Sequence, residues 1–182
     1  MSDEYKGHWI STSRVPQFDF LKPKEQDIHI EDIAHALSLS CRFGGHGRFF
    51  YSVAEHCVLV SLLCEMEEAD DTTCLAALLH DAEEAYLPDI PSPIKACMPE
   101  AEKLYDAIKK AIIRKFQLSE ANWELIDRLD KSICIQEAKA LGIWNEHWIA
   151  TEALKNSVPF GFWSAPKAEE VFLKVFGVLY KK

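Results

Sequence analysis

Apolar residues recur along most of the chain at intervals of three and four, the spacing of amphipathic helices. In the segment 31–41, for example, Ile33, Ala34, Leu37 and Cys41 share one stripe. This pattern and its capping residues predict helices at about 31–41, 52–66, 72–86, 100–116, 119–141 and 168–180. Strand signals are weak, so the sequence predicts an all-α fold, a helical bundle with Trp and Phe in its core.

Breaker and capping residues set the expected boundaries. Ser52 followed by Glu55 is a capping-box pattern, Asp70 or Asp71 can cap the helix that starts at 72, and Ser119 can cap the helix that reaches 141. Segments 1–29, 42–48 and 159–166 are expected to be irregular, and 87–93 is too rich in proline to be helical. No repeat or linker divides the chain, so 1–182 is expected to be a single domain.

Composition and charge narrow the classes of function. With 48% hydrophobic and 27% charged residues, the 182-residue chain has the profile of a globular domain that can bury a core. The net charge of −9 argues against long nucleic acid as a partner, while a small anionic ligand remains possible beside a metal ion. The chain has no apolar run of membrane-spanning length and no secretory signal at its start.

The cysteines point to a reducing compartment. None of the six forms a C-x-x-C pair, and Cys57 and Cys64 lie seven residues apart within one helical pattern, as core residues do. We therefore expect small buried thiols rather than disulfides or a zinc ribbon, and a cytoplasmic protein.

The first candidate for chemistry is the pair His80-Asp81, inside a strongly apolar segment. A buried carboxylate needs a compensating partner, because burial without one is unfavourable by several kcal/mol. Ala76 and Ala77 leave room on the preceding turn, and Glu84 lies four residues after His80. Taken alone, the pair is equally compatible with a metal site and with a buried salt bridge.

Two further helices also direct polar side chains inward. His56 shares its apolar face with Leu59, Val60 and Leu63, where a lone histidine is more often a core residue than a ligand. Asp130 lies on a stripe with apolar residues at 126, 133 and 134, and Glu137 continues that stripe.

A single metal ion would satisfy all of these groups at once. Two His and two Asp side chains from three helices form a nitrogen and oxygen ligand set that suits Zn, Co or Mn, and also Fe or Ni, rather than Ca. Four protein ligands leave positions open for water and for a substrate oxygen. We therefore expect His56, His80, Asp81 and Asp130 to bind one divalent metal.

This order of residues resembles the H…HD…D signature of the HD-domain superfamily, whose members are all-helical and mostly phosphohydrolases. The flanking segments 51–56 (YSVAEH) and 80–95 (HDAEEAYLPDIPSPIK) are similar to those of 5′-deoxynucleotidases and phage dATP triphosphohydrolases. The resemblance covers roughly residues 30 to 141. It favours Asp130 over Asp127, one turn earlier, because Lys131 and Glu137 then match the spacing that follows the last ligand. No His occurs from 82 to 129, which is typical of the mononuclear branch.

The resemblance also implies roles beyond the metal. Glu84 would orient or deprotonate the attacking water, and Asp89 would act near the scissile bond. Arg42 would bind phosphate and Phe43 would pack on the sugar, although the bacterial enzymes are expected to have Trp there. Lys95 would bind phosphate, whereas the sequence without this resemblance suggests an ordinary exposed lysine.

His46 lies close enough in the sequence to be a substrate-binding residue, or it stabilises the turn. Trp144, Trp148 and Phe162 either fill the core or serve an oligomer interface.

The function implied is hydrolysis of a deoxynucleotide at the α-phosphorus, with dATP giving deoxyadenosine and triphosphate. Mg can accompany the substrate phosphates. The alternatives are a 5′-deoxynucleotidase acting on dNMP, a nucleotide-binding regulator without turnover, and a purely structural bundle. A homo-oligomer, either a dimer or a hexamer, in the cytoplasm of a bacterium or a phage-infected cell is implied as well.

Overall fold

The computed structural model describes residues 7–148 and 154–181, and helices make up most of it. The helices are α1 (Ile30–Leu39), α2 (Val53–Met66), α3 (Asp71–Leu78), α4 (Ser92–Lys95), α5 (Pro99–Phe116), α6 (Trp123–Ala140) and α7 (Ala165–Leu179). Short 3₁₀ turns η1 (Glu25–Asp27), η2 (Arg42–Gly45) and η3 (Ala82–Ala85) join them. The expected all-α fold is confirmed.

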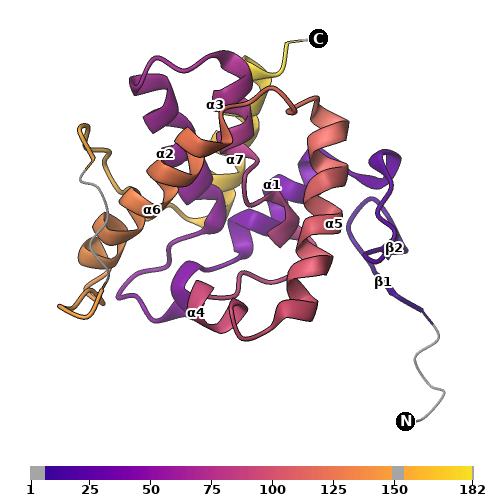
Figure 1. The fold of residues 1–182 in the computed structure, drawn as a ribbon, viewed down its shortest axis with the longest axis horizontal. Helices are drawn as coiled ribbons and strands as arrows, with labels where there is room; N and C mark the ends of the chain where they lie inside the picture. Colours follow the sequence, from indigo (N-terminus) through magenta and orange to yellow (C-terminus); the bar gives the residue numbers. More distant parts are fainter. Residues whose placement is uncertain (1–6, 149–153, 182) are drawn as a thin grey trace.

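Helix α2 lies at the centre of the bundle, in contact with α1, α3, α6 and α7 (Figure 1). Nearly all of its residues are buried, which explains why its sequence is apolar on every side rather than along one stripe. Helix α7 packs across α1, α2 and α3 and buries Ala168 and Phe172. Helices α5 and α6 lie at opposite edges in this view (Figure 1).

The segment expected to be irregular before residue 30 contains a small hairpin. Strands β1 (Trp9–Ile10) and β2 (Phe18–Asp19) pair antiparallel, and the buried Phe18 ring stacks on Tyr86 with centroids 4.1 Å apart. Strands of two residues are too short for an alternating pattern to reveal. The Thr12 hydroxyl donates to the buried Asp32 carboxylate at 2.6 Å, which ties the segment to α1.

Two of the three expected caps agree with the structure. The Ser52 hydroxyl accepts from the Glu55 amide at 3.1 Å, and the Asp70 carboxylate accepts from the Thr73 amide at 2.7 Å. The cap expected at Ser119 is wrong, because α6 begins three residues later, after Asn122. The Asn122 side chain accepts from the Leu125 amide and so takes the role of the cap.

The continuous helix expected from 72 to 86 is also wrong. Helix α3 ends at Leu78, and a turn at 79–81 separates it from η3. In the segment expected to be free of helix because of its prolines, Ser92 and Pro93 open the four-residue α4. Proline is tolerated there because the first turn of a helix needs no amide donor.

The cysteines are free, as expected, but not uniformly buried. Cys57, Cys64 and Cys74 lie in the core, Cys41 and Cys134 are half-buried, and Cys97 is exposed. No helix in the described parts of the chain has both the length and the apolar character to cross a membrane.

Candidate metal centre

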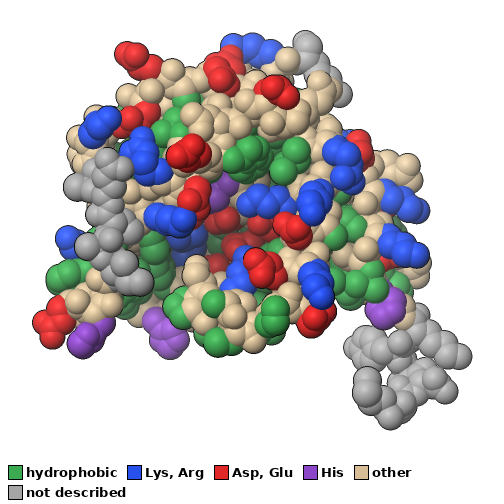
Figure 2. All heavy atoms as spheres, viewed as in Figure 1, with side chains coloured by type: hydrophobic (Ala, Val, Ile, Leu, Met, Phe, Trp, Pro, Cys, Tyr) green, Lys and Arg blue, Asp and Glu red, His purple; other side chains and the backbone are tan. Residues whose placement is uncertain are grey.

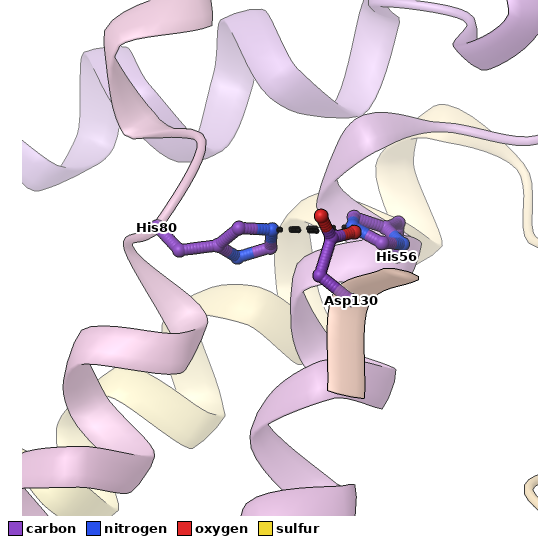
Figure 3. A group of neighbouring side chains, drawn as sticks. All are labelled: His56, His80 and Asp130. Carbon is purple, nitrogen blue, oxygen red and sulfur yellow. Dashed lines mark hydrogen bonds and ion pairs between the residues drawn. The ribbon is translucent and has the colours of Figure 1, made fainter. Parts of the chain in front are cut away.

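Side chains from three separate segments converge on one point. His56 comes from α2, His80 and Asp81 from the turn after α3, and Asp130 from α6. Figure 3 shows His56, His80 and Asp130 pointing toward one another. His56 is fully buried, and the Asp130 side chain is 32% exposed, so the cluster is open on the side of Asp130.

The distances that join the two imidazoles to each other and to the two carboxylates fit one ion. The Nε2 atoms of His56 and His80 are 3.2 Å apart, and Asp130 Oδ1 lies 3.1 and 3.9 Å from them. Asp81 Oδ2 lies 3.7 Å from His56 Nε2 and 3.3 Å from His80 Nε2. Ligand atoms about 2.1 Å from a common metal are about 3.0 Å apart at right angles and about 4.2 Å apart when opposed. All five distances lie within these limits.

The hydrogen bond at the other side of the His80 ring fixes its tautomer. His80 Nδ1 lies 2.7 Å from the Ala77 carbonyl oxygen, which can only accept, so Nδ1 carries the proton. In a continuing helix this oxygen would accept from the Asp81 amide. The break after Leu78 therefore frees the carbonyl that orients the His80 ring and leaves Nε2 with a lone pair.

Glu137 does the same for His56. Its Oε1 lies 2.6 Å from His56 Nδ1 and accepts from the Tyr51 hydroxyl at 2.7 Å. Burial would raise the pKa of Glu137, but Arg42 and the two hydrogen bonds outweigh it and lower the pKa. The carboxylate therefore stays ionised and holds the proton of His56 on Nδ1.

In their neutral forms the two histidines thus turn bare Nε2 lone pairs toward each other and toward two carboxylates. Such an arrangement is repulsive unless a cation, a proton or a metal ion, lies between the groups. A histidine that donates its second ring N–H to a carboxylate or carbonyl is the usual arrangement at a metal. The donor set, its spacing and its supporting bonds all fit a divalent ion.

Arg42 lies beside this cluster. Its Nη1 is 3.5 Å from Asp81 Oδ2 and its Nη2 is 3.3 Å from Glu137 Oε2, while its side chain is only 12% exposed. The next residue, Phe43, has φ = 55°, which is unusual for any residue but glycine. Its ring lies 5.4 Å from the guanidinium and 6.1 Å from the Trp148 ring.

Glu84 and Asp89 lie near enough to Asp81 for their charges to interact with it, and Lys95 pairs with Glu84. Glu84 is buried, and burial together with the charges of Asp81 and Asp89 raises its pKa to about 9. Lys95 Nζ lies 3.6 Å from Glu84 Oε1 and 3.9 Å from the centroid of the Tyr105 ring. Burial raises the pKa of half-buried Asp89, and Arg42 and Lys95 partly oppose this effect.

The structure distinguishes Asp130 from Asp127 as a candidate ligand, and it also gives the position of His46. Asp127 is exposed and pairs with Lys131 at 2.5 Å, so Asp130 is the carboxylate that reaches the histidines. His46 is an exposed residue of the loop, and its amide donates to the Phe43 carbonyl. No contact joins His46 to the candidate ligands in the described residues.

Sequence reasoning missed several supporting residues. Glu137 was visible as a carboxylate on an apolar stripe, but its contacts with His56 and Tyr51 join residues far apart in the chain. Cys57 was expected only as a core residue, yet it forms a second possible ligand group with His80 and Asp81. Burial raises the pKa of the Cys57 thiol to about 11, so without a metal beside it the thiol stays protonated.

The face of the molecule that carries α4 has a hollow between α5 and α6 (Figures 1 and 2). Acidic, basic and histidine side chains form its floor, whereas hydrophobic and charged side chains alternate around its rim (Figure 2). The hollow gives a polar ligand access to charged groups in the middle of this face.

No family model matches the chain. The uncharacterized protein YfdR of Escherichia coli is 38% identical over 135 residues, which cover 74% of this chain and 73% of YfdR. An uncharacterized protein of Rhodobacter capsulatus, RCAP_rcc00048, is 40% identical over 118 residues, which cover 62% of this chain and 60% of that protein. The similarity to YfdR extends over most of both chains, and the protein therefore belongs to the YfdR family.

Proposed function

We propose that this protein is a metal-dependent phosphohydrolase of the HD class that hydrolyses deoxynucleotides at the α-phosphorus, with dATP as the preferred substrate. The observation that carries the proposal is the convergence of two histidine Nε2 atoms, 3.2 Å apart, with one oxygen each of Asp81 and Asp130 that lies 3.1 to 3.9 Å from both nitrogens. Such a set would hold one divalent ion of Zn, Co or Mn type.

The charges around the cluster support a resident cation. Among the described residues, six carboxylates lie in or beside it, and three lysine or arginine side chains form ion pairs with them. The carboxylates are Asp81, Glu83, Glu84, Asp89, Asp130 and Glu137, and the cations are Arg42, Lys95 and Lys109. When bound, a divalent ion would polarise a phosphoryl oxygen and lower the pKa of water.

Arg42 and Lys95 would bind the phosphate chain. Their ion pairs with Asp81, Glu137 and Glu84 measure 3.3 to 3.6 Å, longer than the roughly 2.8 Å of a tight charged hydrogen bond. Pairs of this length leave donor capacity unused, and the buried Nε of Arg42 has no hydrogen-bond partner among the described residues, so a phosphate oxygen could bind there. Mg bound to the phosphates would add to this neutralisation.

Glu84 and Asp89 would move the protons. The buried Oε2 of Glu84 has no hydrogen-bond partner among the described residues, so it can accept a proton from water. A divalent cation held beside Asp81 would offset the charges of Asp81 and Asp89, lower the pKa of Glu84 from about 9, and let Glu84 act as a base. Water then bonds to the α-phosphorus, the bond from phosphorus to the 5′ oxygen breaks, and Asp89 supplies a proton to that oxygen.

The Phe43 ring, with Trp148 behind it, would pack against the deoxyribose. Its position next to Arg42 places an apolar surface beside a phosphate donor. An apolar contact disfavours a 2′-hydroxyl group, because burial would leave that hydroxyl without a hydrogen-bond partner.

The test is incubation of the purified protein with dATP and, separately, with dAMP, in the presence of Mn, Co, Zn or Mg in turn. Products are separated by ion-exchange chromatography. Deoxyadenosine and intact triphosphate from dATP are expected. Phosphate from dAMP alone would instead make the protein a 5′-deoxynucleotidase. No product from either nucleotide while metal is bound would contradict the proposed hydrolysis of dATP and favour a regulator.

Variants connect the activity to the site. Asp81→Ala is expected to abolish metal binding and turnover together, whereas Glu84→Gln should keep the metal and lower kcat by about 100-fold or more. Asp127→Asn, which alters an exposed carboxylate one turn from Asp130, is the matched control and should leave both unchanged. Turnover by Asp81→Ala would show that hydrolysis occurs elsewhere.

A further inference from the structure

Lys109 connects α5 to the turn that carries two of the proposed metal ligands. Its Nζ donates to the backbone carbonyl oxygen of His80 at 2.7 Å and lies 3.4 Å from Glu83 Oε1. The side chain is 33% exposed, and its ammonium lies 5.6 Å from the Trp123 ring. A lysine ammonium has three donors, so it can hold both oxygens at once.

The hydrogen bond from Lys109 matters because of where its acceptor, the His80 carbonyl oxygen, lies in the chain. The oxygen belongs to the peptide bond between His80 and Asp81, and a peptide unit is planar. A donor that holds the carbonyl in one direction therefore restricts ψ of His80 and φ of Asp81 together. Asp81 has φ = −109° and ψ = 19°, a sparsely populated region outside the helical range.

Regular structure does not hold this peptide. Helix α3 has ended at Leu78, and no backbone amide of the described residues donates to the His80 carbonyl. The hydrogen bond from His80 Nδ1 to Ala77 orients one ring, but it does not fix the direction of the next residue.

We infer that Lys109 is a positioning residue for the two adjacent ligands, His80 and Asp81. This inference rests on the proposed metal site. It holds the peptide that joins them so that His80 Nε2 and Asp81 Oδ2, 3.3 Å apart, face the same point. Lys109 itself contacts neither metal nor substrate. Its loss should therefore change the affinity and geometry of metal binding.

Glu83 determines how the test must be designed. Its side chain is 5% exposed, and its Oε2 has no hydrogen-bond partner in the described chain. Replacing Lys109 alone would leave a buried carboxylate without its cation, and unfolding could then mask the effect. The double variant Lys109→Met/Glu83→Gln removes both charges and keeps similar volumes. Glu83→Gln alone retains the bond to the His80 carbonyl and is expected to bind metal as the wild type does.

The matched control uses another pair on α5. Lys110 and Asp106 form an exposed ion pair at 2.8 Å, away from the turn. The variant Lys110→Met/Asp106→Asn removes the same kinds of charge from the neighbouring position. Wild type and variants are titrated with Co²⁺, and affinity and the visible absorption spectrum of the bound ion are recorded, with thermal unfolding in EDTA as the check of folding.

The Lys109→Met/Glu83→Gln variant should bind Co²⁺ about 10- to 100-fold more weakly and with an altered spectrum. The control should match the wild type. If both double variants have the same Co²⁺ affinity and absorption spectrum as the wild type, the role of Lys109 is refuted but the metal site is not. Absence of Co²⁺ binding by the wild type would instead refute the proposed function, and the role of Lys109 with it.

If the double variant does not fold, a different single substitution of Lys109 takes its place in the test. Lys109→Gln keeps a polar group beside Glu83 but is one bond too short to hold the His80 carbonyl as well. It is judged on the same affinity and spectrum, and wild-type values for both would overturn the inference.

Discussion

At the scale of single residues, the proposed ligands depend on partners that only the folded chain provides. His56 and Glu137 are separated by 81 positions in the sequence, yet their side chains meet at 2.6 Å. This contact decides which nitrogen of His56 carries the proton. The sequence could name His56 as a candidate ligand, whereas it could not indicate the tautomer of the ring.

Glu137→Gln tests this support. The amide keeps the shape of the side chain but removes the charge that holds the proton on His56 Nδ1. We expect about a 10- to 100-fold loss of metal affinity, measured by competition with a chromophoric chelator. Glu124→Gln, an exposed change on the same helix, is the control. An unchanged affinity for Glu137→Gln would mean that His56 does not depend on this bond.

Thiol reactivity provides a second test at this scale. Burial raises the pKa of Cys57 to about 11 and that of Cys64 to about 12, and the thiolate is the reactive form. Exposed Cys97 should therefore react first with a thiol reagent at pH 8, and half-buried Cys41 and Cys134 should follow slowly. Cys97→Ser should remove the fast phase, whereas denatured protein should expose all six thiols. A fast phase that persists would contradict the described burial.

At the scale of elements, the start of α2 is held by more than its cap. The pattern Ser52 and Glu55 predicted a capping box, and Ser52 does cap the helix. The Glu55 carboxylate, however, accepts from the backbone amides of Gly161, Phe162 and Trp163 at 2.7 to 2.9 Å. The sequence motif thus identified the residue, but its partner lies more than 100 residues away.

Glu55→Ala is expected to destabilise the protein by about 3 kcal/mol, because three amides lose a charged acceptor. Urea denaturation measures this change, and limited proteolysis should show faster cleavage within 159–166. Glu65→Ala, at the exposed end of the same helix, should remain within about 0.5 kcal/mol of the wild type. Similar midpoints for the two variants would show that the loop is not anchored by Glu55.

The break after α3 shows the limit of reading elements from periodicity. The apolar spacing continues past Leu78, so a single helix to 86 was expected. The structure instead uses the Ala77 carbonyl for the His80 ring. Competition between a side-chain donor and a backbone donor for one oxygen leaves no trace in the spacing of apolar residues.

At the scale of the whole molecule, the candidate centre joins α2, α6 and the turn after α3. A metal that binds only the folded state stabilises it by about 2.7 kcal/mol at 100 times its Kd. For a chain of this size, that corresponds to a rise in Tm of roughly 5–10 °C relative to EDTA. Differential scanning calorimetry with Co²⁺ or Zn²⁺ measures the rise.

Two carboxylates on α6 serve as test and control for this prediction. Asp130→Asn should lose most of the metal-dependent rise in Tm, because it removes a charged ligand. Asp127→Asn changes the exposed neighbour and should retain the rise. Equal behaviour of the two variants would exclude Asp130 as a ligand.

The sequence by itself determined the all-α class, the approximate course of α1, α2, α5, α6 and α7, and the inward direction of His56, Asp130 and Glu137, because these properties depend on residue type and local spacing. Only the tertiary structure decided that α3 ends before His80, that Glu137 and Ala77 set the tautomers, and that Arg42 and Lys109 stand beside the cluster. The physical reason is that hydrogen bonds and charge pairs between side chains act over a few ångströms in space, whatever their separation along the chain.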